Sequence, residues 1–190
     1  MRKRMSKSDR REQLLLVAED IVKNQGTDAL TLITLAEQAG VSKPVTYEHF
    51  THREGLFVAL YQRYDHQVIQ AIQQSMLTAS SLDLAAQAVA TAYLHCAFNY
   101  GQQYEAIVAA LQGYIGYSDL KFRIRNYFVD AYSTIFTPFL IGSTPHIQMK
   151  LIAIYGATDE IAMAAVQNNM DHEIAIELMK KMILAILNSD

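Results

Sequence analysis

The 190-residue chain has one cysteine, three prolines, no tryptophan and no long hydrophobic run. The single cysteine, Cys96, has no partner for a disulfide within the chain, which is typical of a reducing compartment. No apolar run reaches the roughly 18 residues of a membrane-spanning helix. The basic N-terminus is not followed by the apolar core of a secretion signal. These absences favour a cytoplasmic protein that does not enter a membrane.

The residue sets of common enzyme sites are also missing from the sequence. It has no Ser/His/Asp set, no glycine-rich phosphate loop and no Cys or His residues at metal-ligand spacing. His95 and Cys96 are neighbours in sequence, so on a helix they point about 100° apart and do not form a nucleophile–base pair. We therefore predict no catalytic residue, no metal and no cofactor.

The hydrophobic pattern is helical along the chain, and no β-type alternation persists. Apolar residues recur at intervals of three and four, which predicts an all-α fold. Pro138 is expected to bend or end one helix, and Gly101 to break another. The expected helices are three short ones within residues 8–50, then residues 51–77, 82–100, 104–111, 118–141, 145–168 and 171–187, with a turn at residues 142–145.

Residues 31–50 have the pattern of two short helices joined by a tight turn. Thr31 and Ser42 can each cap a helix, and Pro44 suits a first helical turn. Gly40 suits the left-handed residue that follows a helix end. The segment Thr51-His-Arg-Glu54 has the sequence of a capping box for the next helix. The pattern predicts a helix-turn-helix, which places its second helix in the major groove of DNA.

The same segment resembles a known family. The sequence from residue 31 to residue 56 is similar to that of TetR-type (TetR/AcrR-like) transcriptional regulators, on the residues Thr31, Leu35, Ala36, Ala39, Gly40, Val41, Ser42, Tyr47, His49, Phe50, Arg53, Glu54 and Leu56. The resemblance implies an all-helical homodimer. Residues 1–53 would be the helix-turn-helix DNA-binding domain, and residues 54–190 the helical domain that binds a ligand and dimerises.

Positive charge is concentrated at the N-terminus although the chain has a net charge of −3. Six of the first eleven residues are Lys or Arg, and residues 1–53 carry a net +2 against −5 for residues 54–190. A basic arm beside a helix-turn-helix fits the neutralisation of DNA phosphates. A solvated charged tail is the alternative interpretation.

The expected DNA contacts come from the motif. The resemblance implies phosphate contacts for Tyr47, His49 and Arg53, and a base or phosphate contact for Lys43. Tyr, His and Lys side chains can all donate hydrogen bonds to phosphate. The full predicted set is Thr31, Lys43, Pro44, Val45, Thr46, Tyr47, His49 and Arg53.

The remainder of the chain offers a ligand pocket and a dimer interface. Tyrosine and phenylalanine side chains with a few polar groups would suit a small, mostly apolar effector, although plain core packing explains any single one of them. The predicted pocket residues are Tyr93, His95, Cys96, Asn99, Tyr114, Phe128, Tyr132 and Asp159. The last two helices are apolar on more than one face, which predicts a four-helix bundle between two subunits. The predicted interface residues are Ile152, Tyr155, Met163, Val166, Met182, Ile183 and Ile186.

From these features we expect a DNA-binding transcriptional regulator, released from a palindromic operator by a small molecule. Repression is implied by the resemblance alone. Two alternatives stay open at this point: a regulator that responds to a protein partner or to no ligand, and, remotely, a small helical enzyme.

Overall fold

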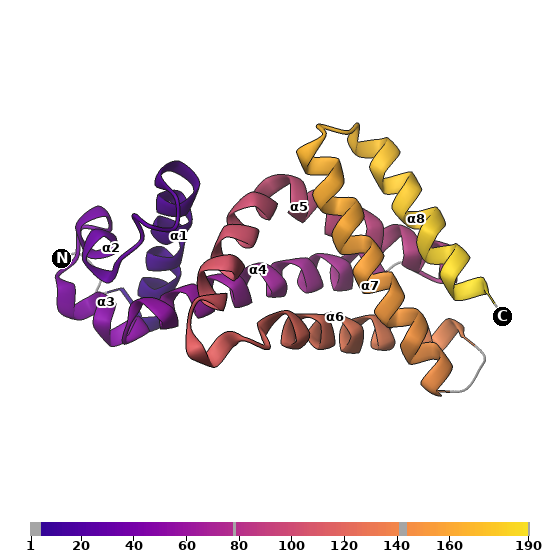
Figure 1. The fold of residues 1–190 in the computed structure, drawn as a ribbon, viewed down its shortest axis with the longest axis horizontal. Coiled ribbons are helices and arrows are strands. Elements are labelled where there is room, and N and C mark those ends of the chain that lie inside the picture. Colours follow the sequence, from indigo (N-terminus) through magenta and orange to yellow (C-terminus); the bar gives the residue numbers. More distant parts are fainter. Residues whose placement is uncertain (1–4, 78, 141–143, 190) are drawn as a thin grey trace. The chain divides into compact units, whose positions relative to one another are not determined.

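The computed structural model describes residues 5–77, 79–140 and 144–189. Its described part is all-α, as expected from the hydrophobic pattern, and contains no strand. Figure 1 shows the order of the elements along the chain. They are α1 (Lys7–Gln25), α2 (Leu32–Gln38), α3 (Lys43–Phe50), α4 (Arg53–Met76), α5 (Leu82–Gln112), η1 (Ile115–Tyr117), α6 (Leu120–Phe136), η2 (Thr137–Phe139), α7 (Thr144–Gln167) and α8 (His172–Asn188).

The contacts of the chain divide it into two compact units. The first consists of Met1–Tyr64 and Gln102–Ser118, and the second of Asp65–Gly101 and Asp119–Asp190. The chain passes between the two units three times: inside α4, inside α5, and between η1 and α6 at residues 118/119. The predicted division into residues 1–53 and 54–190 remains a prediction about independent domains.

The first three helices begin and end as their sequences dictate. Ser6 caps α1, its hydroxyl accepting the Asp9 N–H at 3.0 Å, and Gly26 ends that helix at a φ of 81°. Thr31 caps α2 through a reciprocal capping box with Thr34. Gly40 has a φ of 65°, a left-handed conformation that costs glycine little. The buried residues of these helices are Leu14, Leu15, Ala18, Ile21, Val22, Leu32, Leu35, Ala36, Thr46 and Phe50.

Two predicted caps are wrong. The Ser42 side chain makes no capping hydrogen bond to α3. Thr51 does not start a capping box, because it lies at a φ of 63° as the residue that ends α3. The imidazole Nδ1 of His52 accepts the Gly55 N–H at 3.1 Å instead. The side chain that accepts a hydrogen bond from the first turn of α4 is thus that of His52 and not that of Thr51.

Gly101 does not break a helix, contrary to the prediction. The expected helices 82–100 and 104–111 form one continuous helix, α5. Glycine inside a helix costs only about 1 kcal/mol relative to alanine, which tertiary packing readily offsets. The position is buried, and a Cβ placed there would lie 3.8 Å from the Ala97 Cβ.

The second unit ends in three helices that pack in sequence order, α6 on α7 and α7 on α8. Pro138 ends α6 as predicted, and the chain continues as the 3₁₀ turn η2. The predicted turn at residues 142–145 lies largely outside the described residues, and α7 begins at Thr144. Asp171 caps α8 by accepting the Ile174 N–H at 3.0 Å. In Figure 1, α7 and α8 run side by side as a hairpin.

Across the described residues, no helix is both long enough and apolar enough to cross a membrane.

Candidate DNA-binding surface and effector region

Helix α3 is held against α2 by a buried polar contact. Thr46 is fully buried, and its hydroxyl donates to the backbone carbonyls of Leu32, at 2.8 Å, and Lys43, at 2.9 Å. A hydroxyl with no exposed surface has no access to DNA. The expectation that Thr46 contacts DNA is therefore wrong. The Thr46 hydroxyl instead holds α3 against α2.

The opposite side of α3 faces solvent. Lys43, Pro44 and Glu48 are exposed, and Tyr47 is 48% exposed although it is a large aromatic residue. Val45 and His49 are half-buried beside them. This face therefore offers an ammonium group, a phenol and an imidazole to a partner. We call the face made by Lys43, Tyr47 and His49 the α3 face.

His49 links the α3 face to α1. Its backbone carbonyl accepts a hydrogen bond from Arg11 at 3.0 Å, and that guanidinium lies 4.9 Å from the centre of the Phe50 ring. Desolvation lowers the pKa of the His49 imidazole, with smaller contributions from neighbouring charges. Arg11 thus positions the end of α3.

Arg53 and Thr31, both predicted to contact DNA, are used mainly inside the domain. The Arg53 guanidinium donates to the carbonyls of Leu30 and Thr27 at 2.7 Å each, and it lies 4.8 Å from the centre of the Phe57 ring. The Thr31 hydroxyl accepts the Thr34 N–H at 3.1 Å. Because these donors and acceptors already have partners, any part that the two residues play at DNA is secondary to holding the turn before α2.

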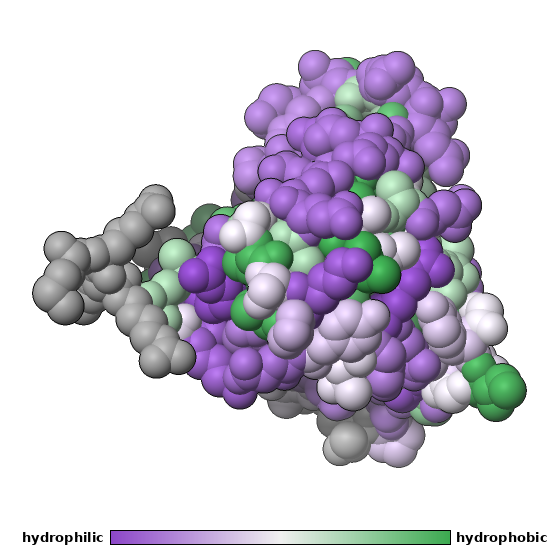
Figure 2. Space-filling model, turned by 90° about the vertical axis from the view of Figure 1, so that its left-hand side faces the viewer, coloured by the Kyte–Doolittle hydropathy of each residue, from purple (hydrophilic) through white to green (hydrophobic). Residues whose placement is uncertain are grey.

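The described part of the basic arm contacts α3. The Lys7 ammonium lies 3.2 Å from the Glu48 carboxylate, and both side chains are well exposed. Arg10 donates to the side chain of Gln13. Arg2, Lys3 and Arg4, which make up half of the predicted basic arm, lie outside the described residues. Figure 2 faces the side of the molecule that carries the N-terminal helices, and it shows a largely hydrophilic surface with small, separate hydrophobic spots.

Four of the eight predicted pocket residues meet in the second unit. The Tyr93 hydroxyl donates to Asp159 at 3.0 Å. The Phe128 ring packs edge-on against Tyr93, with ring centres 5.8 Å apart, and near Tyr132 at 6.2 Å. Burial raises the pKa of the Asp159 carboxyl, while the Tyr93 hydrogen bond and the Lys121 charge oppose the shift. We call Tyr93, Phe128, Tyr132, Tyr155 and Asp159 the aromatic cluster; Tyr155 stacks on Phe128 at 5.6 Å.

The other four predicted pocket residues lie elsewhere or face differently. His95 and Asn99 are exposed and hydrogen-bonded to each other. Cys96 is buried, and burial raises the pKa of its thiol. Tyr114 belongs to the first unit. A helical pattern of polar and aromatic residues did not distinguish an inward-facing tyrosine from an outward-facing histidine two residues away.

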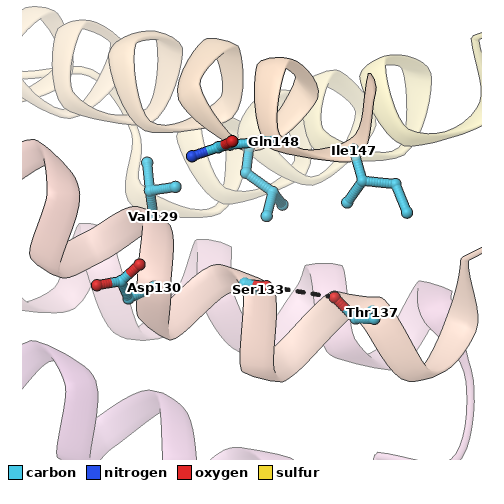
Figure 3. Close-up of a pocket in the computed structure, with 7 residues that line it drawn as sticks. Val129, Asp130, Ser133, Thr137, Ile147 and Gln148 are labelled. Carbon is cyan, nitrogen blue, oxygen red and sulfur yellow. Dashed lines mark hydrogen bonds between the residues drawn. The ribbon is translucent and has the colours of Figure 1, made fainter. Parts of the chain in front are cut away.

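A surface hollow between α6 and α7 was not predicted from the sequence. It has a volume of about 280 Å³ and is drawn in Figure 3. Its lining residues are Val129, Asp130, Ser133, Thr137, Ile147, Gln148 and Leu151. Asp130, Ser133 and Thr137 follow each other at intervals of three and four, so a polar helical stripe was the signal available in the sequence.

The predicted dimer residues are partly exposed, with one exception. Ile183 is fully buried within its own subunit, which contradicts its placement at the interface. Ile152, Tyr155, Met163, Val166, Met182 and Ile186 are half-buried. The residues that the prediction missed are more exposed: Met149 at 66%, Ile174 at 64% and Leu178 at 49%. Ile174 and Leu178 lie one turn apart on α8, and neighbouring exposed apolar side chains are typical of an interface.

Metal binding has no visible basis in the described part of the chain, where no group of three or more His, Cys, Asp or Glu residues could hold an ion.

Known proteins match the N-terminal helices in sequence and the whole chain in fold. Residues 14–60 match the family model of bacterial regulatory proteins of the tetR family. The matched segment contains most of α1, all of α2 and α3, and the start of α4. The helix-turn-helix segment of the chain is thus similar to that of TetR-type regulators.

A curated relative is the HTH-type transcriptional activator FasR of Mycolicibacterium smegmatis. The two are 35% identical over 75 residues, which is 40% of this chain and only 34% of the relative. The similarity thus spans about a third of that relative's length.

Solved structures agree over nearly the full length. A TetR-like transcriptional regulator from a Rhodococcus species has a TM-score of 0.70 at 17% identity, with 98% of this chain and 100% of that chain covered. The regulator FadR from Bacillus subtilis, solved with stearoyl-CoA, has a TM-score of 0.71 at 17% identity, with 93% and 97% covered. At these identities the structures establish the fold, including the helical part beyond the family model.

Proposed function

We propose that the protein binds a DNA operator through α3 as a homodimer and regulates transcription from it. The observation that carries the proposal is the α3 face. A helix seated on α2 by the buried Thr46 hydroxyl presents Lys43 and Tyr47 outward, as the second helix of a helix-turn-helix must. The proposed DNA contacts are Lys43, Pro44, Val45, Tyr47 and His49.

The proposed dimer forms through α7 and α8. Met149, Ile174 and Leu178 are exposed large apolar residues on this hairpin. Two copies packed as a four-helix bundle would bury them and would pair two α3 helices by a two-fold axis. The operator is then a palindrome whose half-sites lie about 34–36 Å apart.

The second unit is proposed to bind a small effector that releases the DNA, so that the protein acts as a repressor in the cytoplasm. The support is the fold shared with the Bacillus FadR, whose structure holds stearoyl-CoA, so an acyl-chain compound is the first effector to test. To lower operator affinity 100-fold, the effector must favour the released state by about 2.7 kcal/mol. By linkage, operator DNA must weaken effector binding by the same factor.

Selection of operators from random DNA, repeated with a panel of acyl compounds, tests this function. We expect one palindromic sequence to be enriched and one class of compound to abolish the enrichment. Enrichment that no compound changes would favour a regulator controlled by a protein partner. Failure to enrich any sequence would overturn the proposal. In a reporter strain, loss of the gene should raise transcription from the selected operator, whereas a fall would make the protein an activator, as its mycobacterial relative is named.

A further inference from the structure

Two cations on α6 lack the partners that the other cations of the second unit have. Arg123 pairs with Asp119 at 3.2 Å, Lys180 with Asp83 at 2.9 Å and Lys181 with Glu177 at 3.2 Å. Lys150 donates to the Leu187 carbonyl at 3.1 Å. Lys121 and Arg125 make no ion pair or hydrogen bond to a described residue.

Of these two cations, Arg125 has the less favourable environment. Its Nε–H is buried and has no acceptor among the described residues. Burying part of a guanidinium without an acceptor costs free energy, so such a group calls for an explanation. The guanidinium carbon lies 4.5 Å from the centre of the Phe122 ring, which holds the group in place without neutralising it.

The two cations lie on the face of α6 that leads to the aromatic cluster. Lys121, Arg125, Phe128 and Tyr132 follow one another at intervals of four, three and four, which places them on one side of the helix. Phe128 and Tyr132 are buried, with exposed fractions of 3% and 0%. One side of α6 therefore changes from two cations in its first turns to buried aromatic rings further along.

The start of α6 adds to the positive character of this end. Asp119 precedes the helix but makes no capping hydrogen bond to it, because its carboxylate is used by Arg123. The first backbone N–H groups of a 17-residue helix carry partial positive charge. Lys121 interacts electrostatically with the Asp159 carboxylate, which also accepts a hydrogen bond from the Tyr93 hydroxyl. Of the two cations, Arg125 is therefore the one that an anionic ligand would stabilise more, because Lys121 already interacts with Asp159.

We propose that Arg125 and Lys121 bind the anionic head of an amphipathic ligand whose apolar part lies toward the aromatic cluster. The head is a carboxylate or a phosphate, since both accept hydrogen bonds from a guanidinium. This inference rests on the proposed function in taking the second unit as the effector-binding part. It goes further by assigning the charged end of the effector to named residues.

The test is direct calorimetric titration of the full chain without DNA. The probes share a ten-carbon chain: decanoate, decyl phosphate and 1-decanol, which carries no charge. The variants are Arg125→Gln and Lys121→Gln, and the matched control is Arg123→Gln, which removes the same charge from the same helix but from another face. Arg125→Lys retains the charge, and circular dichroism melts check that each variant is folded.

We expect the wild type to bind at least one anionic probe at least tenfold more tightly than 1-decanol. Arg125→Gln and Lys121→Gln should each weaken that binding by about tenfold, the usual effect of losing a charged hydrogen bond. Arg123→Gln should leave it unchanged, and Arg125→Lys should retain more of it than Arg125→Gln. The preferred probe identifies the head as carboxylate or phosphate.

Several results would overturn the site: no binding of either anionic probe, equal affinity for 1-decanol, or equal losses in Arg123→Gln and Arg125→Gln. Operator release is measured separately. A probe that binds through Arg125 but does not release DNA would leave the site intact and reject ligand-controlled release. An effector that releases DNA equally from wild type and Arg125→Gln would support ligand-controlled release but reject the site at Arg125.

Discussion

Tyr47 presents a phenol to solvent from a helix whose other aromatic residue, Phe50, is buried. We predict that Tyr47→Phe, which removes only the hydroxyl, weakens operator binding by about 1.5–3 kcal/mol, the value of a hydrogen bond to a charged acceptor. Fluorescence anisotropy with the selected operator measures the effect. The control is Tyr127→Phe, a similarly exposed tyrosine of the second unit. Unchanged affinity in Tyr47→Phe would remove the hydroxyl from the interface.

Asp159 gives a prediction about pH. Burial holds the pKa of this carboxyl above its ordinary value of 3.8, so the folded state binds the proton more tightly than the unfolded state. The stability associated with this group is therefore fully present below pH 3.8 and is lost as pH rises through the folded pKa. Asp159→Asn, which can still accept from Tyr93, should raise the free energy of unfolding at pH 7.

The gain from Asp159→Asn should shrink toward zero well below pH 3.8, where the wild-type carboxyl is protonated in both the folded and the unfolded state. Urea unfolding at about pH 3 and at about pH 7 measures it. Asp130→Asn, at an exposed carboxylate, is the control and should show little change at either pH. A stability loss in Asp159→Asn at pH 7 would mean that the carboxylate is stabilising in its charged form.

Polar residues are where sequence and structure differ most at this scale. Thr46 and Arg53 have side chains that commonly meet phosphate, and their positions fit the motif. The sequence does not reveal that the Thr46 hydroxyl lies 2.8 Å from a backbone carbonyl of α2. Nor does it reveal that the Arg53 guanidinium lies 2.7 Å from two carbonyls of the turn between α1 and α2. Tyr47 and Lys43 were placed correctly on the surface because an exposed helical face follows from periodicity alone. Whether they touch DNA remains a prediction.

At the scale of elements, the junction of α3 and α4 has no room for a side chain at Gly55. A Cβ placed there would lie 2.3 Å from the Phe50 carbonyl oxygen, a contact with backbone that cannot rotate away. Gly55→Ala should therefore destabilise the protein by about 2 kcal/mol or more, in the range of overpacked sites. Thermal unfolding followed by circular dichroism measures this.

Gly101 provides the opposite case and serves as the control. An added Cβ would make only an ordinary contact there, 3.8 Å from Ala97, inside a continuous helix. Gly101→Ala should stabilise the protein by up to about 1 kcal/mol through helix propensity. If both variants unfolded at the same temperature, the close approach at Gly55 would not be present in solution.

Element boundaries were predictable where local chemistry decides them. Thr31, Gly40 and Pro138 act within their own turn, and their effects were confirmed. Gly101 was misjudged because its effect depends on packing across the helix, which a single sequence does not display. The start of α4 was misjudged for a similar reason: His52, rather than Thr51, supplies the group that meets the Gly55 N–H.

At the scale of the whole molecule, the proposed dimer depends on exposed side chains of α7 and α8. Leu178→Glu should weaken dimerisation more than tenfold, because it places a charge where an apolar side chain would be buried. Light scattering at micromolar concentration measures the change. Leu84→Glu, at an exposed leucine of α5, is the matched control and should remain dimeric. A wild-type protein that is monomeric under these conditions would contradict the arrangement.

The discontinuous first unit has a consequence for attempts to isolate the DNA-binding part. This unit includes Gln102–Ser118 as well as Met1–Tyr64, and two of its three crossings to the second unit lie inside α4 and α5, whereas the third, at residues 118/119, lies between η1 and α6. A protease that needs an extended, accessible loop finds none at the two helical crossings, so a cut at the third leaves the first unit joined to the rest of the chain. A fragment ending at residue 64 would also lose Tyr104, whose ring packs edge-on to that of Tyr64. The first unit should therefore resist both excision by limited proteolysis and transplantation as a contiguous N-terminal piece.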